Sequence, residues 1–272
     1  MDGFFQNKTG HFDHRTIIGQ QYGSKIYNNK STGYVYVLRP DPVLLTDSIA
    51  HKTQILYQAD ISIVISKLNI QPGSIVVESG TGSASLSSSI ARVVQNSGHL
   101  FTFEFNEERA KNGQEVLNTQ KLKNFDVIWR DVISFGFLPQ EGEKYNLSKN
   151  KADAVFLDLP RPSEAICHAV EVLKKGGRLC CFSPCIESVQ KNCEEMRKYQ
   201  FVQIETIEIL QRNFYKRENE VEDDNNANKS NNENDDEEDE QQHYNSKNQV
   251  LYTSGPSEIK GHTGYLTFAI YQ

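Results

Sequence analysis

The sequence lacks several features that mark common classes of protein. No uninterrupted apolar run approaches the roughly 20 residues of a membrane-spanning helix, and the opening residues MDGFFQNKTG have neither the basic nor the apolar region of a signal peptide. No Gly-x-x-x-x-Gly-Lys-Ser/Thr loop is present, which argues against a nucleoside triphosphatase. The lack of a membrane-spanning run and of a signal peptide predicts a soluble, intracellular protein with no membrane partner.

The cysteines show no pattern of a metal site or a disulfide framework. Three of the five, Cys180, Cys181 and Cys185, lie in one apolar run. The other two, Cys167 and Cys193, stand alone. Because no paired C-x-x-C spacing is present, we expect reduced, mostly buried thiols and no metal.

Negative charge is concentrated in one stretch of the chain. Residues 218–240 contain 12 Asp or Glu and a single Lys, a net charge of −11, so the remainder carries +4 of the total of −7. A stretch of Asn and acidic residues with almost no apolar side chains cannot bury enough surface to offset the entropy lost on ordering. We therefore expect a disordered acidic insertion at residues 217–250 in an otherwise mildly basic protein.

Two patterns divide the chain into domains. Residues 1–50 contain short β-type runs, such as GYVYVL at 33–38, which predict a small β-rich N-terminal domain. Within residues 51–272, apolar strands alternate with amphipathic helices after Gln71-Pro72-Gly73. That alternation is typical of a parallel sheet with crossover helices, so we expect an α/β, Rossmann-like second domain.

Seven strands and the helices between them can be placed in this second domain. The strands are expected at residues 74–79, 99–104, 126–130, 154–157, 177–182, 202–210 and 265–271. The helices are expected at residues 58–68, 85–94, 107–118, 162–172 and 187–198, with Gly176-Gly177 as a stop signal before the fifth strand. Only the acidic insertion separates the last two strands, so we expect these two to pair antiparallel.

The strongest local signal is VVESGTGSAS at 76–85, a strand that runs into a Gly-x-Gly turn and then a helix. Glycines at Gly80 and Gly82 let the backbone approach a ligand, and a helix N-terminus offers unpaired N–H groups. By itself this pattern is weak evidence, because glycine turns also simply connect strands to helices.

Four acids strengthen the case for a nucleotide-like ligand. Glu78 lies in the first strand, Glu104 ends the second 22 residues after Gly82, and Asp131 and Asp158 follow the third and fourth strands. The carboxyl ends of parallel strands share one crevice, so these side chains should converge there. A carboxylate at Glu104 suits ribose hydroxyls, and one at Asp131 suits an adenine amino group.

Two classes of enzyme share this arrangement. A nicotinamide-dependent dehydrogenase favours Gly-x-Gly-x-x-Gly/Ala, whereas Ser85 fills the third position here. Glu78, two residues before Gly80, fits S-adenosylmethionine-dependent methyltransferases better. We therefore expect a methyltransferase with S-adenosylmethionine as its cofactor.

With these residues in hand, the chain resembles the TrmI-like class I methyltransferases over nearly its whole length, and among them the catalytic subunits of the eukaryotic tRNA (adenine-58-N1) methyltransferases. Four strings carry the resemblance: KTQILY at 52–57, AVFLDLP at 154–160, FSPCIE at 182–187 and GHTGYLTFA at 261–269. It implies a seven-stranded, mostly parallel sheet with an antiparallel last strand, behind a small β-rich domain.

The resemblance also implies a set of site residues, to be added to Glu78, Gly80 and Gly82. The implied cofactor contacts are Leu56, Ser83, Ala84, Ser85, Glu104, Arg109, Asp131, Val132 and Asp158. The implied RNA contacts are Gln54, Tyr57, Ser183, Pro184 and His262. Ala84 departs from the family, which usually has glycine there, and the family's opening strands ahead of residues 16–19 are largely missing. The latter implies a reduced lead-in domain or a sequence that begins late.

The implied reaction is methyl transfer to N1 of adenine 58 in the tRNA T-loop, by a nuclear heterotetramer with a homologous non-catalytic subunit. Such a transfer needs an in-line, desolvated acceptor nitrogen more than strong acid-base help. As the catalytic residue, Asp158 would bind the exocyclic amine of adenine and favour its developing positive charge. Two alternatives stay open, a catalytically silent RNA-binding partner subunit and a class I methyltransferase with a non-tRNA substrate.

Overall fold

The computed structural model describes residues 3–49, 53–211, 214–220, 249–254 and 264–272. The chain divides into two units, Met1–Ile207 with Gly264–Gln272, and Glu208–Thr263. Within the described residues, no helix is long and apolar enough to cross a membrane.

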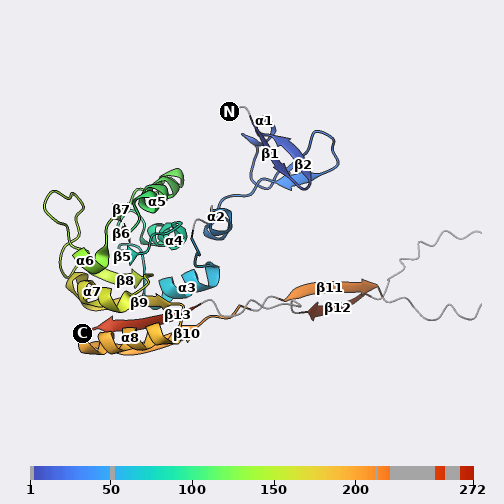
Figure 1. Cartoon of the computed structure of the whole chain (residues 1–272). Coiled ribbons are helices and arrows are strands. Elements are labelled where there is room, and N and C mark those ends of the chain that lie inside the picture. Colours follow the sequence, from blue (N-terminus) through green and yellow to red (C-terminus); the bar gives the residue numbers. More distant parts are fainter. Residues whose placement is uncertain (1–2, 50–52, 212–213, 221–248, 255–263) are drawn as a thin grey trace, which may run out of the picture. The chain divides into compact units, whose positions relative to one another are not determined.

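Two short antiparallel hairpins open the chain (Figure 1). The elements of this region are β1 (Phe4–Asn7), β2 (Gly10–Asp13), α1 (His14–Ile17), β3 (Lys25–Tyr27), β4 (Tyr34–Tyr36) and α2 (Pro42–Ser48). The first pair, β1 with β2, precedes the segment at 16–19. The sequence predicts that the family's opening strands ahead of this segment are largely missing, and the structure has this one hairpin there.

The two hairpins are held together by Asn28. Its Nδ2 donates to the carbonyl oxygen of Thr9 over 2.8 Å, and its Oδ1 accepts from the backbone N–H groups of Lys30 and Thr32. Phe12 of the first hairpin and Ile26 of the second are buried. A single asparagine therefore fixes the turn of the second hairpin against the first.

A seven-stranded sheet forms the centre of the first unit, and it confirms the expected fold class. Its strands are β5 (Ile75–Ser79), β6 (His99–Glu104), β7 (Phe125–Trp129), β8 (Ala152–Leu157), β9 (Leu173–Ser183), β10 (Phe201–Glu208) and β13 (Tyr265–Tyr271), in the order β10-β13-β9-β8-β5-β6-β7. Neighbours from β7 to β9 pair in parallel, whereas β13 is antiparallel to β9. The strand order reverses at β5, which lies between β6 and β8.

One helix precedes the strands of the sheet, and the others follow individual strands (Figure 1). They are α3 (Gln58–Lys67), α4 (Ser85–Val94), α5 (Glu107–Thr119), α6 (Val132–Phe135), the 3₁₀ turn η1 (Pro162–Ala165), α7 (Ile166–Val172) and α8 (Ile186–Lys198). Asn106 caps α5 by accepting from the backbone N–H of Arg109. The strands contribute Phe103 and Leu157 to a core in which both are fully buried. Each expected helix is present, and α6 is an addition that the sequence pattern does not show.

The glycine pair at Gly176-Gly177 does not stop the helix as expected. Helix α7 already ends at Val172, and strand β9 begins at Leu173. Gly176 has φ +77°, and the pairing of β9 with β8 shifts register between Ala152 and Ala154. The glycines therefore form an irregularity inside the strand, where a positive φ is easy for glycine.

The last strand of the sheet lies between two strands that precede it in the chain. Strand β13 neighbours both β9 and β10, so the last two strands are adjacent as expected. In the second unit, β11 (Tyr215–Glu220) and β12 (Gln249–Ser254) pair antiparallel. Both ends of the segment predicted as disordered, 217–220 and 249–250, are thus strands, and residues 221–248 lie outside the described residues.

Candidate active site

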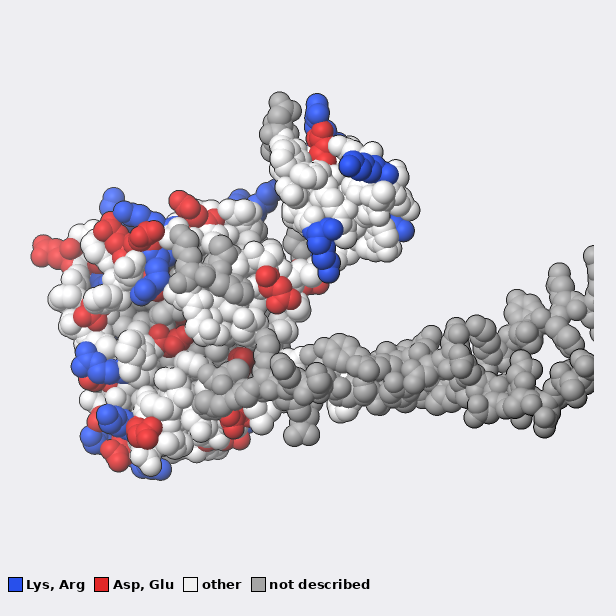
Figure 2. All heavy atoms as spheres, turned by 45° about the vertical axis from the view of Figure 1, so that its right-hand side comes forward, with Lys and Arg blue, Asp and Glu red and all other residues white. Residues whose placement is uncertain are grey.

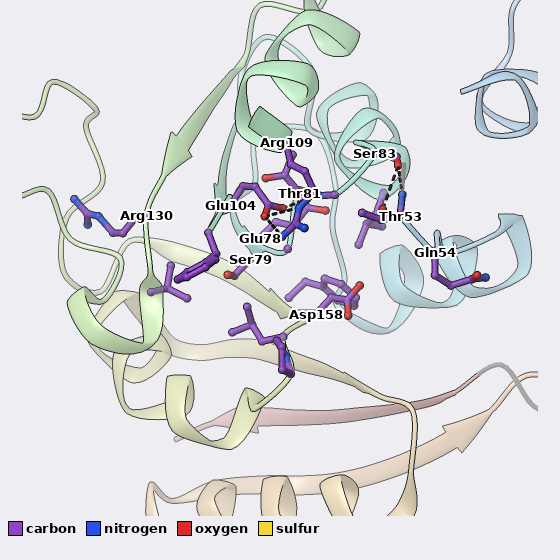
Figure 3. Close-up of a pocket in the computed structure, with 18 of the residues that line it drawn as sticks. Thr53, Gln54, Glu78, Ser79, Thr81, Ser83, Glu104, Arg109, Arg130 and Asp158 are labelled. Carbon is purple, nitrogen blue, oxygen red and sulfur yellow. Dashed lines mark hydrogen bonds and ion pairs between the residues drawn. The ribbon is translucent and has the colours of Figure 1, made fainter. Parts of the chain in front are cut away.

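A pocket of about 560 Å³ opens at the carboxyl ends of the central strands (Figure 3). That size lies within the range of small-molecule sites. The residues that line it are Thr53, Gln54, Ile55, Leu56, Glu78, Ser79, Gly80, Thr81, Gly82, Ser83, Ser85, Leu86, Glu104, Phe105, Arg109, Arg130, Asp131, Val132, Ile133, Ser134, Phe156, Asp158, Leu159, Pro160 and Arg161. The predicted cofactor residues therefore converge on one cavity, with the exception of Ala84. This is the crevice position where doubly wound sheets bind ligands.

The Gly-x-Gly turn is tightly packed against its neighbours. Gly80 has φ +99°, and a Cβ there would overlap the carbonyl oxygen of Asp158. Gly82 has φ +52°, and a Cβ there would lie 2.9 Å from Oγ1 of Thr53. Both positions need glycine, one for its conformation and close approach to the fourth strand, and the other for room beside the segment that precedes the core.

Ala84 does not line the pocket. It is fully buried and precedes α4 with φ 61° and ψ 27°, a left-handed conformation that costs an L-residue on the order of 1 kcal/mol. The family's usual glycine fits this backbone conformation without strain. The expected contact of Ala84 with the cofactor stays a prediction.

Glu104 is buried and well hydrogen-bonded. Its Oε1 accepts from Nη2 and Nε of Arg109, over 2.6 and 2.9 Å, and from the backbone N–H of Asn106. Its Oε2 accepts from the N–H of Gly82 over 2.9 Å. The carboxylate thus links the second strand to the glycine turn and to α5. Because a carboxylate oxygen has two lone-pair sites, Oε2 can accept one more donor from the pocket.

Two other acids of the pocket have raised pKa values. Burial raises the pKa of Glu78 to about 7, against the opposing hydrogen bond from Ser87 and helped by the charges of Asp158 and Glu104. Burial and the charge of Glu104 raise the pKa of Asp158 to about 6. The pocket thus contains three acids, Glu78, Glu104 and Asp158, and Arg109 pairs with Glu104. A positively charged ligand would favour the ionised forms of these acids, so the pocket favours such a ligand.

Asp131 is both the N-cap of α6 and part of the pocket lining. It caps α6, since Oδ1 accepts from the N–H groups of Ile133 and Ser134, and Oδ2 accepts from Oγ of Ser134 over 2.7 Å. These bonds lower its pKa, with the Ser134 hydroxyl as the largest cause. Three donors leave capacity for one more on a carboxylate that also lines the pocket.

The segment ahead of α3 forms one wall of the pocket. Oγ of Ser83 accepts from the N–H of Thr53 over 3.3 Å and lies 3.1 Å from Oγ1 of the same residue. Oγ of Ser85 donates to the carbonyl oxygen of Leu56 over 3.1 Å. The two serines after the glycine turn therefore hold residues 53–56 against the site, and Gln54 of that stretch is exposed at the pocket.

Arg130 belongs to the pocket although the sequence pattern does not single it out. Its guanidinium is buried and donates to the carbonyl oxygens of Gly136 and Leu138 and to Oη of Tyr145, and it forms an ion pair with Glu143. It points away from the centre of the cavity in Figure 3. Its role is to fasten the loop that follows α6. No local sequence signal reveals this role, because most of the acceptors are backbone carbonyl oxygens.

Among the described residues, one of the predicted RNA contacts lines the pocket. Of the five, Gln54 lines the pocket, whereas Tyr57, at the start of α3, does not. Ser183 is fully buried and its hydroxyl accepts from Nδ2 of Asn192, while the next residue, Pro184, is exposed. His262 lies outside the described residues. These contacts stay predictions, and among the described residues no cluster of His, Cys, Asp or Glu is arranged to hold a metal ion.

The comparisons with known proteins agree on one family. The family described as "tRNA methyltransferase complex GCD14 subunit" matches residues 33–271. The chain is 43% identical to the tRNA (adenine(58)-N(1))-methyltransferase catalytic subunit of Dictyostelium discoideum, over 98% of this chain and 88% of that one. It is 39% identical to the corresponding catalytic subunit of Candida albicans, over 80% of this chain and 64% of that one.

Solved structures with the same fold include two methyltransferases. An S-adenosylmethionine-dependent O-methyltransferase from Thermotoga maritima superposes with a TM-score of 0.77 at 24% identity, over 99% of this chain and 85% of that one. The tRNA (m1A58) methyltransferase TrmI from Aquifex aeolicus superposes with a TM-score of 0.71 at 23% identity, over 100% and 90%. The fold, the pocket and the match over residues 33–271 lead to one conclusion: the chain belongs to the family of tRNA methyltransferase complex GCD14 subunits.

Proposed function

We propose that this chain is the catalytic subunit of a tRNA methyltransferase that transfers a methyl group from S-adenosylmethionine to N1 of adenine 58 in the T-loop. The observation that carries the proposal is the convergence of the glycine turn with Glu78, Glu104, Asp131 and Asp158 on one pocket. The relatives that are 43% and 39% identical are named as catalytic subunits for this reaction, which supports the choice of substrate.

The pocket's donors and acceptors fit S-adenosylmethionine. Oε2 of Glu104 has room for a ribose hydroxyl, and Asp131 has room for the amino group of an adenine ring beside Val132. The buried acids Glu78 and Asp158 favour a ligand that carries net positive charge. The bound cofactor supplies a methyl group already activated on a sulfonium.

We assign the action on the base to Asp158. It follows β8 at the pocket, and its N–H donates to the carbonyl oxygen of Ser79, so the backbone of the glycine turn fixes its position. As a carboxylate it accepts from the exocyclic amine of adenine and stabilises the positive charge that develops on the ring when N1 is alkylated. The same carboxylate can take the proton that the amine then releases more readily.

The target adenine must leave its stack to reach this pocket. Adenine N1 is covered in paired or stacked RNA, so the base has to be extruded before it can meet an in-line methyl donor. We assign to Gln54 a contact with the extruded nucleotide, which its exposed position in the pocket lining supports. Closing the base into the pocket also removes water from the acceptor nitrogen.

A second subunit is part of the proposal. Outside residues 218–240 the chain carries a net charge of only +4, which is small for a protein that must neutralise tRNA phosphates. We propose a homologous non-catalytic subunit that completes the RNA-binding surface as a heterotetramer, consistent with the word "complex" in the family's description. A nuclear location is proposed on the resemblance alone, and a fluorescent fusion in cells tests it.

A methylation assay on an unmodified tRNA transcript tests the function, with the chain alone and with the second subunit. Primer-extension arrest at position 58 is the expected result. A thermal shift on addition of S-adenosylmethionine distinguishes the alternatives: no shift and no methylation would identify a silent RNA-binding subunit, whereas a shift without tRNA methylation would identify an enzyme with another substrate.

A further inference from the structure

One face of the second N-terminal hairpin is lined with aromatic side chains. In the register of β3 with β4, Lys25 lies opposite Tyr36 and Tyr27 lies opposite Tyr34, while Ile26 lies opposite Val35. Because side chains alternate between the faces of a strand, the three tyrosines and Lys25 share one face. We call this set, Lys25, Tyr27, Tyr34 and Tyr36, the tyrosine face.

The tyrosine face is open to solvent. Its tyrosines are between 45% and 55% exposed, whereas Ile26 on the opposite face is 8% exposed. Large aromatic side chains usually bury far more of their surface, so three half-exposed rings together indicate a surface that binds something. The opposite face, with Ile26 inward and the turn fixed through Asn28 to Thr9, holds the hairpin in place.

The rings and the cation are in mutual contact. The ring centroids of Tyr27 and Tyr34 are 6.1 Å apart, and those of Tyr34 and Tyr36 are 5.5 Å apart, in edge-on arrangements. Nζ of Lys25 lies 3.7 Å from the ring centroid of Tyr34. A positive charge is thus held beside an aromatic surface, the combination with which proteins bind unpaired nucleotides by stacking on the base and attracting the phosphate.

The surrounding sequence is basic. Residues 14–40 contain four Lys or Arg and no Asp or Glu, and the nearest acid before them, Asp13, is paired with Arg15 over 2.7 Å. Figure 2 shows several blue side chains on the visible face of this N-terminal region and few red ones. A second, open pocket of about 680 Å³ includes the hairpin's turn and is lined in part by Lys8, Arg15 and Lys30. The charge favours an anionic polymer over an acid-rich or neutral protein surface.

We propose that the tyrosine face is a stacking site for an unpaired nucleotide of the RNA substrate, with Lys25 and the basic turn contacting its phosphates. The inference rests on the proposed tRNA substrate, and it adds a binding site separate from the methyl-transfer pocket. Tyr34 is the central residue, since it touches both other rings and the cation. A base that stacks on a tyrosine ring makes no hydrogen bond through its edge, so stacking does not distinguish one base from another. The site would therefore increase the affinity for RNA without selecting a sequence.

Steady-state methylation kinetics with the full chain, in whichever assembly methylates tRNA, tests the proposal. We expect Tyr34→Ala to raise the KM for tRNA about 5-fold or more, with kcat and the KM for S-adenosylmethionine unchanged. Tyr34→Phe keeps the ring and should retain the wild-type KM. Lys25→Gln should raise the KM for tRNA. It should also reduce the slope of log KM against log salt concentration by about 1, the value expected for the loss of one phosphate contact. Tyr199→Ala, an exposed tyrosine at the end of α8, is the matched control.

A tryptophan introduced by Tyr34→Trp gives a direct readout that does not depend on turnover. This variant should retain the KM for tRNA, and RNA should quench its emission beyond the change seen with the wild type, which has Trp129 alone. An unchanged KM in Tyr34→Ala together with no added quenching overturns the proposal. So does a Tyr34→Ala protein that stays folded but elutes without its second subunit, because the face would then bind protein. If the wild type does not methylate tRNA at all, the proposed function fails, and quenching of the Tyr34→Trp variant by RNA still decides whether the face binds RNA.

Discussion

The backbone of Gly80 packs directly against the backbone of Asp158. The glycine turn after the first strand and the acid after the fourth are thereby one unit, because any side chain at Gly80 would overlap the carbonyl oxygen of Asp158. The N–H of Asp158 in turn donates to the carbonyl oxygen of Ser79. The cofactor turn and the proposed catalytic carboxylate cannot move independently.

Gly80→Ala should therefore disable the enzyme more than its own strain explains. We expect the substitution to lower the melting temperature and to abolish methyl transfer, because the new methyl group displaces Asp158 as well as straining a backbone at φ +99°. Differential scanning fluorimetry and the methylation assay measure the two effects. Gly176→Ala is the control, since it has φ +77° with no atom near its Cβ, and it should cost only about 1 kcal/mol and leave turnover intact.

Asp158→Ala should abolish methyl transfer to tRNA while S-adenosylmethionine binding falls less. The carboxylate is assigned to the base, whereas Glu104 and Asp131 are assigned to the cofactor. Asp158→Asn keeps the size but not the charge and should also lose turnover. Calorimetric titration of the cofactor and single-turnover methylation separate the two effects, and near-normal turnover in either variant would contradict the assignment.

The ligand-free protein should become more stable as the pH falls from 8 to 5.5. The pKa of Glu78 rises from 4.5 to about 7 and that of Asp158 from 3.8 to about 6, both mainly through burial. A raised pKa in an acid means that the folded state binds the proton more tightly than the unfolded state. This stabilisation is full below the ordinary pKa values of 3.8 and 4.5, and it is lost as the pH rises from there to the folded-state values of about 6 and about 7. For Glu78 alone the change over this window is roughly 2 kcal/mol.

Glu78→Gln isolates that contribution. The amide can keep the hydrogen bond with Ser87 but carries no charge, so unfolding by urea at pH 8 should show a higher free energy than for the wild type. At pH 5.5 the difference should be smaller by about 2 kcal/mol, and it should vanish only below about pH 4.5, where Glu78 is protonated in both the folded and the unfolded state. Equal pH dependence in the two proteins would show that Glu78 is not the group that titrates.

Binding of S-adenosylmethionine should release protons near pH 6 to 7. A cation beside Glu78 and Asp158 favours their ionised forms and lowers pKa values that burial holds high. Titration calorimetry in buffers of different ionisation enthalpy measures the proton count. The neutral-sulfur product, S-adenosylhomocysteine, should release fewer protons, and an equal release by both would place the sulfonium away from these acids.

Arg130→Ala should loosen the loop after α6 and weaken cofactor binding indirectly. The variant leaves the carbonyl oxygens of Gly136 and Leu138 without their donor and Glu143 without its partner. We expect a loss of about 2 kcal/mol in the free energy of unfolding, because the variant removes a buried guanidinium that donates to two carbonyl oxygens and to Oη of Tyr145. Protease sensitivity at residues 139–144 that does not rise in the variant would argue against this role.

The strands of the sheet and the acids behind them could be predicted because each is encoded locally. Apolar runs placed the strands to within two residues in most cases, for example at 99–104 and 265–271, and the rule that parallel strands end in one crevice placed Glu104 and Asp158 together. Strand β9 begins at Leu173, four residues before the predicted start at residue 177. A bulge near Gly176 lets the pairing with β8 continue where the sequence alone indicates a stop.

What the sequence could not show depends on contacts between distant or irregular segments. Arg130 donates to backbone carbonyl oxygens of a loop that has no periodic pattern. Every residue has such a carbonyl group, so the sequence does not show which residues are the acceptors. The resemblance implies an RNA contact at Ser183, yet this residue is fully buried and Asn192 of the next helix donates to its hydroxyl. The tyrosine face becomes visible only when register places Tyr27 and Tyr34 opposite each other.

The placement of β13 between β9 and β10 has a consequence for synthesis of the protein. The ribosome releases β9 and β10 first, and more than fifty residues separate Glu208 at the end of β10 from Tyr265 at the start of β13. Until β13 emerges, both earlier strands have an unpaired edge, and such edges template aggregation. A nascent chain stalled before residue 265 should therefore depend on chaperones, and the long charged segment translated in that interval would keep this intermediate soluble.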